Sequence, residues 1–281
     1  MSETSRFAPS PTGLLHLGHA YSAVLAAQAG RFLLRIEDLD PTRRRTEFVA
    51  AIDEDIAWLG LSSAEPPLIQ SDRSEVYAAA LDRLRAERLA YPCYCTRVDI
   101  TAALSAPHGA AAHYPGTCRD LPDDPARRAS TPHSWRLDTA QALARTGLPT
   151  WRESDTIHAT TPADLNDIIL ARKDAPAAYH LACVVDDAAS GVTLVTRGVD
   201  LRSSTSIQRL LQTLLDLPDP AYRHHPLVTH AAIPGQPARR LAKRDHAPTL
   251  AAMRATGVDG RALAADLRVH RLPLGFALSH T

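Results

Sequence analysis

Apolar strand-like runs alternate with amphipathic helical segments over the first 90 residues, and this alternation restricts the possible folds more than any other feature of the chain. The run RFLLRIEDLD, between Gly30 and Pro41, is typical of a buried strand. Apolar residues recur at helical spacing over 46–61, and a second amphipathic helix is predicted over 74–89. Successive strand–helix units favour a parallel sheet covered by helices, which is an α/β fold.

The regular pattern stops between Ala90 and about Pro132, where proline and histidine are frequent and three of the four cysteines occur. It returns at Ser134, and later runs such as GVTLVTRG and HHPLVTHAAI each predict one strand. An insertion between two halves of one α/β domain explains this interruption. We therefore predict a first half over 1–90, an inserted subdomain over 91–175, a second half over 176–235 and a basic helical region over 236–281.

Composition excludes several classes of protein. Hydrophobic residues make up 45% of the 281 residues and charged residues 22%, which excludes disordered, collagen-like and coiled-coil chains. No apolar run approaches the roughly 20 residues of a membrane helix, and the polar start contains no signal-peptide core. Four cysteines are too few for a disulfide scaffold and indicate a reducing compartment, so we expect a cytoplasmic protein without membrane contact.

Basic residues are unevenly distributed in type and in position. The formal net charge is zero, but the last 43 residues carry eight Lys or Arg against three Asp or Glu, and nucleic-acid binding depends on such local patches.

Only two of the 31 basic residues are lysines, Lys173 and Lys243. Lys243 follows Arg240 in RLAKR, where an ammonium group can act as a point charge on a transferring phosphate. The simpler interpretation is a solvated basic loop.

Two histidines, His16 and His19, lie three positions apart in HLGH, at the expected start of a helix. A helix N-terminus has free N–H groups and a partial positive charge, which suits a polyphosphate. Gly18 would let the ligand approach the backbone. A pair of capping or surface histidines is the alternative explanation of this segment.

The segments RFAPSPTG, HLGH, LRIEDLD, YHLACVVDD, TRG and RLAKR together resemble, in this order, the catalytic core of the class I glutamyl-tRNA synthetases. HLGH stands for the HIGH signature of that family and RLAKR for its mobile KMSKS-type loop. The resemblance extends from about Arg6 to His246. It implies a Rossmann-like parallel sheet, an inserted zinc-containing acceptor-type subdomain and a short C-terminal helical region that contacts the RNA stem.

In that family, both signatures stabilise the triphosphate of ATP while a carboxylate attacks its α-phosphorus. The resemblance implies ATP as a substrate, together with Mg²⁺, and catalytic roles for His16, His19 and Lys243. The implied ATP-binding residues are His16, Gly18, His19, Arg240 and Lys243.

A pocket for free glutamate has to hold one ammonium group and two carboxylates, so it needs an acidic side chain and at least one arginine. The resemblance implies that Glu37 holds the ammonium group and that Arg197 pairs with the side-chain carboxylate. The other glutamate-binding residues that it implies are Arg6, Ala8, Ser10 and Tyr179. Cys183 lies in the apolar run LACVV and is interpreted as core packing.

One connection departs from the family pattern. Seventeen positions separate Gly18 from Arg35, fewer than in members of the family. The helix after HLGH is therefore expected to be shorter, or its exit turn trimmed, while the phosphate-binding end is retained.

Three cysteines of the insertion form the pattern Cys-x-Cys followed by a distant third cysteine, which can bind a metal through thiolates. Their chemistry alone leaves the fourth ligand open between His108, His113 and Tyr114. The resemblance implies zinc with the tyrosine oxygen as a ligand, because C-x-C…Y-x3-C matches a short branch of the family. The implied ligands are Cys93, Cys95, Tyr114 and Cys118, and the alternative is three buried free thiols.

Full-length glutamyl-tRNA synthetases continue past the mobile loop into helical anticodon-binding domains, whereas 35 residues follow His246 here. The short branch without those domains, the glutamyl-Q tRNA(Asp) synthetases, activates glutamate without tRNA and transfers it to queuosine in the anticodon of tRNA(Asp). We expect that activity, in a monomer whose partners are glutamate, ATP and queuosine-containing tRNA(Asp). Two alternatives remain, a truncated glutamyl-tRNA synthetase that charges a tRNA 3′ end and a non-catalytic RNA-binding paralogue.

Overall fold

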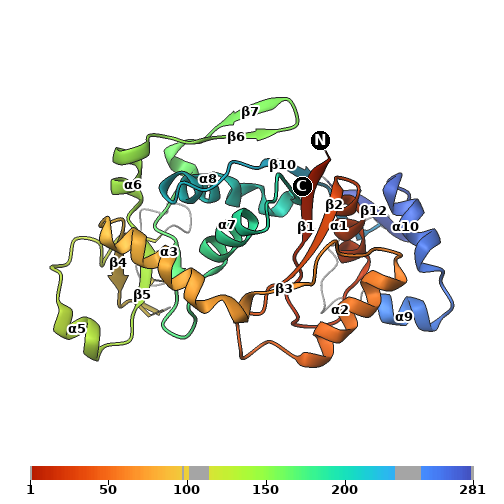
Figure 1. Ribbon diagram of the computed structural model, residues 1–281, viewed down its shortest axis with the longest axis horizontal. Helices are drawn as coiled ribbons and strands as arrows, with labels where there is room; N and C mark the ends of the chain where they lie inside the picture. The colour runs from red at the N-terminus through yellow and green to blue at the C-terminus, as the bar shows by residue number, and fades with distance from the viewer. Residues whose placement is uncertain (1, 97, 101–113, 232–247, 280–281) are drawn as a thin grey trace.

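The computed structural model describes residues 2–96, 98–100, 114–231 and 248–279. Its first part is a parallel sheet in the order β1-β2-β3, with one helix in each connection (Figure 1). The strand–helix alternation of the sequence predicted this arrangement. Its elements are β1 (Glu3–Phe7), α1 (Leu17–Ala27), β2 (Gly30–Ile36), α2 (Thr46–Trp58) and β3 (Leu68–Ile69).

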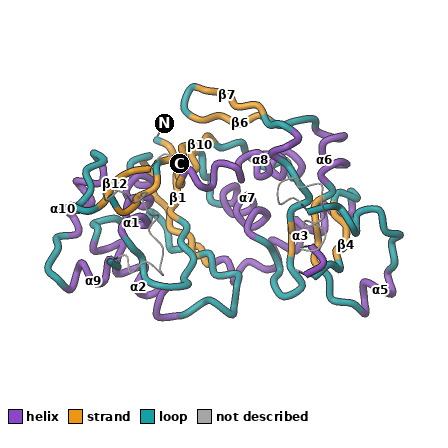
Figure 2. Tube along the Cα trace, turned by 180° about the vertical axis from the view of Figure 1, so that it is seen from behind, coloured by secondary structure: helices purple, strands orange, loops and turns teal. Residues whose placement is uncertain are grey.

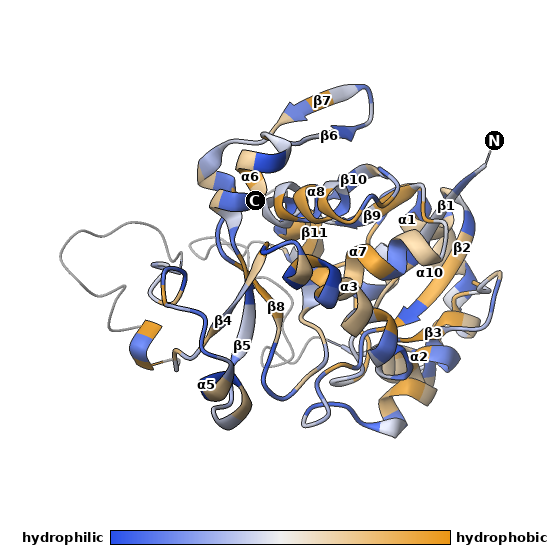
Figure 3. Ribbon diagram, turned by 60° about the vertical axis from the view of Figure 1, so that its left-hand side comes forward, coloured by the Kyte–Doolittle hydropathy of each residue, from blue (hydrophilic) through white to orange (hydrophobic). Residues whose placement is uncertain are grey.

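A second sheet has the order β7-β6-β10-β9, in which β6, β10 and β9 are parallel and β7 is antiparallel to β6. Helix α7 precedes β9, and a 3-10 helix followed by α8 connects β9 to β10; Figure 3 shows hydrophobic stretches in both α helices. The elements are β6 (Thr150–Glu153), β7 (Thr156–Ala159), α7 (Tyr179–Ala189), β9 (Leu194–Gly198), η3 (Val199–Ser204), α8 (Thr205–Leu214) and β10 (Ala221–His225).

The two sheets meet where β1 runs beside β9. The backbone N–H of Thr193 donates to the carbonyl of Thr4 at 3.0 Å, and the hydroxyl oxygens of Ser5 and Thr196 lie 3.3 Å apart. The combined layer has the order β3-β2-β1-β9-β10-β6, and the connections from β1 through β2 to β3 and from β9 to β10 run outward in opposite directions. In open α/β sheets, ligands bind at such a switch point, outside the carboxyl ends of the strands.

The insertion forms an antiparallel sheet of its own, β4-β5-β8, on one side of the molecule (Figure 1). The hairpin β6–β7 comes from the same range of sequence but pairs with β10, at Glu153 and Tyr222. Helix α6 begins where Asp138 accepts the backbone N–H of Gln141. The remaining elements here are η1 (Gln70–Arg73), α3 (Ser74–Ala86), β4 (Ala90–Cys93), α5 (Pro125–Ser130), β5 (Ser134–Leu137), α6 (Thr139–Thr146), η2 (Pro162–Asp164) and β8 (Ile169–Ala171).

The C-terminal segment lies against the first sheet's helices, on the side of the molecule opposite the insertion (Figure 2). Helix α10 packs on α1, and a Cβ at Gly260 would lie 2.4 Å from the carbonyl oxygen of Trp58, so only glycine fits this approach. The single strand expected for HHPLVTHAAI was wrong: the chain breaks at Pro226, and β11 leaves β10 to pair with β12. The elements are β11 (Leu227–His230), α9 (Leu250–Ala255), α10 (Gly260–Arg268) and β12 (Phe276–Ser279).

The connection between α1 and β2 is short. Helix α1 has 11 residues, and only Gln28 and Ala29 separate its end from Gly30, the first residue of β2. Gly30 has φ of 130°, and a Cβ there would lie 2.9 Å from the carbonyl oxygen of Glu3, so the tight exit turn depends on glycine. Within the described ranges, no helix combines the length and apolar character needed to cross a membrane.

Candidate active site

A cavity of about 390 Å³ lies at the carboxyl ends of the neighbouring strands β2, β1 and β9. The start of α1 and β11 also line it, and β11 contributes Leu227 and Val228. Nine residues that the sequence singled out line this cavity: Arg6, Ala8, Ser10, His16, Gly18, His19, Glu37, Tyr179 and Arg197. The two remaining residues implied for ATP binding, Arg240 and Lys243, lie outside the described residues.

The HLGH histidines form the N-terminus of α1. His16 is the N-cap residue, and its Nδ1 accepts the backbone N–H of Gly18 at 3.2 Å, while its own N–H donates to Nδ1 of His19 at 3.1 Å. The two ring centroids are 3.9 Å apart. Because both Nδ1 atoms accept hydrogen bonds, the neutral rings carry their protons on Nε2. A Cβ at Gly18 would lie 3.1 Å from the His16 ring, so the capping geometry itself favours glycine.

The described residues on either side of 232–247, the segment that contains Arg240 and Lys243, lie beside these histidines. On one side, β11 lines the cavity. On the other, Thr249 forms a β-bridge with His16, and the N–H of Leu250 donates to the carbonyl of Leu15 at 2.8 Å. Both ends of the expected mobile loop are therefore anchored at the cavity.

A buried charge network includes Arg6 and Glu37, two of the residues that line the cavity. Asp187 accepts two hydrogen bonds from Arg6, at 2.8 and 3.3 Å, and a further one from Arg35. Arg35 also donates to Glu37 at 2.9 Å. Burial opposes the charge of Asp187, but the two guanidinium groups outweigh it and lower the pKa of the carboxyl group. The two arginines are thus balanced by the carboxylates of Asp187 and Glu37. The charge of Arg6 is therefore neutralised inside the protein.

Arg197 differs from Arg6 because its partners are neutral. It is 5% exposed, and it donates to Gln208 Oε1 at 2.7 Å, to Thr205 Oγ1 at 2.8 Å and to His224 Nε2 at 3.3 Å. These bonds use three of its five N–H groups. Among the described residues it forms no ion pair, so a buried positive charge faces the cavity without an anion. A bound carboxylate would compensate that charge.

Glu37 lies directly after β2, and its side chain is 14% exposed. Its Oε1 accepts from Arg35 and from the thiol of Cys183, at 3.4 Å. Burial raises the pKa of the Cys183 thiol, which therefore stays protonated and can donate. Cys183 is buried as predicted, yet it also contacts the site. Tyr179 begins α7, and burial raises the pKa of its phenol, so it too remains a donor.

Sequence reasoning missed Asp186 and Asp187, which fix α7 relative to the rest of the site. Asp187 pairs with the two arginines, and Asp186 accepts from Gln70 at 2.8 Å and Arg73 at 2.7 Å. A signal was present, because LACVVDDAAS contains two adjacent acids inside an otherwise apolar helix. Carboxylates that are buried in such a helix are almost always paired.

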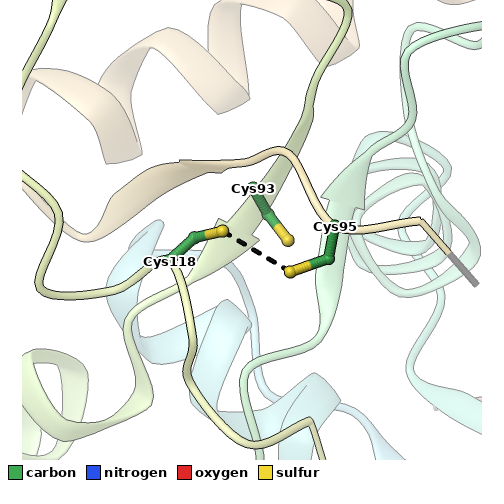
Figure 4. A group of neighbouring side chains, drawn as sticks. All are labelled: Cys93, Cys95 and Cys118. Atoms are coloured by element: carbon green, nitrogen blue, oxygen red, sulfur yellow. Dashed lines mark hydrogen bonds between the residues drawn. The ribbon is translucent and has the colours of Figure 1, made fainter. Parts of the chain in front are cut away.

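The four expected metal ligands lie together in the insertion. The Sγ atoms of Cys93, Cys95 and Cys118 are all within 4.8 Å of one another, and Figure 4 shows the three thiols directed toward a common point. The Tyr114 hydroxyl lies 3.3 and 3.4 Å from two of these sulfurs and accepts the N–H of Cys118 at 3.0 Å. Three sulfurs and one oxygen in this arrangement suit a closed tetrahedral site. His108 and His113 lie outside the described residues.

Asp167 anchors this cysteine cluster to the sheet of the insertion. Its side chain is 1% exposed and accepts from Arg119, the neighbour of Cys118, at 2.8 Å and from the Tyr91 hydroxyl. It also accepts the backbone N–H of Thr139 at 3.1 Å. Sequence reasoning missed this residue, although an acid inside the apolar run LNDIIL was visible.

A Rossmann-like layer with an HLGH helix at its switch point defines a class I synthetase catalytic domain. Residues 4–269 match the family described as tRNA synthetases class I (E and Q), catalytic domain, and the chain belongs to this family. Within it, the chain is 44% identical to a protein of Rhodobacter capsulatus named Glutamyl-Q tRNA(Asp) synthetase, over 94% of this chain and 98% of that one. Proteins of the same name from Nocardia farcinica (45% identity; 90% of this chain, 79% of that one) and Deinococcus radiodurans (43%; 97% and 90%) are also similar.

Two solved structures show the same fold. They are a glutamate-tRNA synthetase from Elizabethkingia anophelis, with a TM-score of 0.77, and a glutamate tRNA ligase from Elizabethkingia meningosepticum in complex with its amino acid, with a TM-score of 0.78. Each is 24% identical and aligns with 95% of this chain. The chain spans 61% and 60% of their lengths.

Proposed function

We propose that the protein activates glutamate with ATP, without needing tRNA, and transfers the glutamyl group to queuosine in the anticodon of tRNA(Asp). One observation carries the proposal: a single cavity is lined by the HLGH histidines, by Glu37 and by Arg197, whose charge has no anionic partner among the described residues. The shared name of the three relatives supports the acceptor.

In the first step, the α-carboxylate oxygen of glutamate attacks the α-phosphorus of ATP. A new oxygen–phosphorus bond forms, the bond to the β-phosphate oxygen breaks, and pyrophosphate leaves glutamyl-adenylate in the site. His16 and His19, at the start of α1, stabilise the phosphate charge, and Gly18 has no side chain that would keep the phosphates away from the backbone. Arg240 and Lys243 would place positive charge beside the negatively charged triphosphate, and a Mg²⁺ ion bound to ATP would neutralise part of that negative charge.

The amino acid is held at the other end of the cavity. Arg197 pairs with the side-chain carboxylate of glutamate, and Glu37 accepts from its ammonium group. Arg6, Ala8, Ser10 and Tyr179 complete the pocket. In the second step, the queuosine nucleophile attacks the activated carbonyl carbon, and AMP leaves.

Zinc is proposed as the structural metal of the insertion, held by Cys93, Cys95, Tyr114 and Cys118. Three thiolates and a phenolate leave no open coordination position, so the ion supplies stability and takes no part in the reaction. The Arg136 guanidinium lies 3.8 Å from the centroid of the Tyr114 ring, in a cation–π contact that holds the ring in place. Three other expectations also stay predictions. They are the division of the α/β domain into two halves around an insertion, the monomeric state and the cytoplasmic location.

Metal analysis checks the zinc site. We expect about one zinc ion per chain in gently purified protein, and a large loss of zinc in Cys118→Ser, because a closed site needs all four ligands. Tyr114→Phe should also bind zinc more weakly. Cys183→Ser is the matched control, since this cysteine belongs to the cavity and should leave zinc content unchanged. Full zinc in Tyr114→Phe would mean that another group completes the site.

Two assays test the proposed function. Glutamate-dependent exchange of pyrophosphate into ATP should proceed without tRNA. Labelled glutamate should then appear on queuosine-containing tRNA(Asp), but not on unmodified tRNA(Asp) or on tRNA(Glu). Label on tRNA(Glu), or label removed with the 3′-terminal adenosine, would favour a truncated glutamyl-tRNA synthetase. An absence of exchange would favour a non-catalytic RNA-binding protein.

A further inference from the structure

Behind Arg197, a chain of hydrogen bonds leads away from the cavity to the β6–β7 hairpin. His224 Nε2 lies 3.3 Å from Arg197 Nε, and His224 Nδ1 lies 2.7 Å from Glu153 Oε1. The His224 side chain is 2% exposed and that of Glu153 is 19% exposed. Neither residue lines the cavity, yet together they form one of the three supports of the guanidinium group that does.

The geometry determines which nitrogen of His224 carries the proton. Glu153 Oε1 accepts both the backbone N–H of His224, at 2.8 Å, and the hydrogen on Nδ1. Nε2 is therefore the lone-pair nitrogen, and it accepts from Arg197 and from the Thr205 hydroxyl, each at 3.3 Å. Burial and the charge of Arg197 lower the pKa of His224 to about 4, so the ring is neutral near pH 7.

The opposite tautomer would place the Nε2–H of His224 against the Nε–H of Arg197. Two donors facing each other repel, so the guanidinium group would have to turn. The carboxylate of Glu153 prevents this because it is acceptor-only and requires a hydrogen on Nδ1. A carboxylate that accepts the hydrogen of one ring nitrogen commonly fixes the tautomer and the orientation of a functional histidine.

We propose that Glu153 and His224 are positioning residues that hold the Arg197 guanidinium group in the orientation that receives the side-chain carboxylate of glutamate. This inference rests on the proposed glutamate pocket. Because the direct partners of Arg197 are neutral, its charge remains available to the substrate. The nearest anion on this side is the carboxylate of Glu153, which is separated from Arg197 by the imidazole ring of His224. The same arrangement favours a carboxylate over the uncharged amide of glutamine.

Kinetics with glutamate and ATP varied separately test the proposal. Glu153→Ala should raise the KM for glutamate about tenfold, as expected when a charge-assisted hydrogen bond is lost, while the KM for ATP stays close to wild type. Glu153→Gln should restore glutamate binding, because its amide oxygen can still accept the hydrogen on Nδ1. The matched control is Arg152→Ala, on the same strand, because Arg152 is exposed and should change neither constant.

Nuclear magnetic resonance of ¹⁵N-histidine protein gives a readout that needs no substrate. Wild-type His224, assigned by loss of its signals in His224→Gln, should show a protonated Nδ1 and a bare Nε2, and Glu153→Ala should mix the two tautomers. A protonated Nε2 in the wild type would overturn the proposal. So would an unchanged KM for glutamate in Glu153→Ala, provided that the wild type performs glutamate-dependent exchange. A wild type without that exchange would overturn the proposed function itself.

Discussion

Replacement of Arg197 by alanine should raise the KM for glutamate by about thirtyfold or more and leave the KM for ATP nearly unchanged. Removing one partner of a buried charge pair costs about 2–5 kcal/mol, and about 1.4 kcal/mol corresponds to a factor of ten. The effect should be this large because Arg197 is 5% exposed and forms no ion pair with a carboxylate in the described part of the chain. Glutamate-dependent pyrophosphate exchange at varied glutamate and ATP measures both constants.

Two further variants make this result specific. Arg197→Lys keeps the charge but loses the planar fork that holds three neutral acceptors, so it should recover only part of the affinity for glutamate. Arg223→Ala removes an exposed arginine opposite Thr196, beside Arg197, and should behave as wild type. Equal increases in both Michaelis constants of Arg197→Ala would identify a structural role and contradict the proposed pairing.

Replacement of Lys243 by alanine should lower the rate of glutamate activation by at least about a hundredfold, which matches the loss of one transition-state charge contact. The side chain lies outside the described residues, but Thr249 and β11 hold the two ends of its segment at the cavity, next to the HLGH histidines. The resemblance to the family implies that its ammonium group acts as a point charge on the transferring phosphate.

The chain supplies its own control for this prediction. Lys173, the other lysine, is exposed between β8 and α7 and does not line the cavity. Lys173→Ala should therefore retain full exchange activity. Activity close to wild type in Lys243→Ala would remove the residue from the reaction, and an equal loss in both variants would indicate a general effect of charge.

Most of the parallel layer was predictable because its signals are local. Helix periodicity located α2 and α3, and the apolar run after Gly30 located β2. The residues that line the cavity could also be nominated from sequence, because each sits within a few residues of the end of a strand or the start of a helix. Pro226 shows the limit of this approach, because an apolar run alone did not reveal that the strand changes partner there.

Sequence by itself determined which chemistry-bearing residues are present and which element each belongs to: the HLGH helix start, the acid after β2, the arginine near the end of β9 and the three cysteines of the insertion. Tertiary structure decided how these groups are charged and held. Arg6 meets Asp187 across 181 positions, and His224 meets Glu153 across 71. Such pairs leave no periodic trace, because side-chain partners across a sheet depend on strand order and register. Only the folded chain therefore distinguishes Arg6, which is paired with Asp187, from Arg197, which has no anionic partner among the residues that the structure describes.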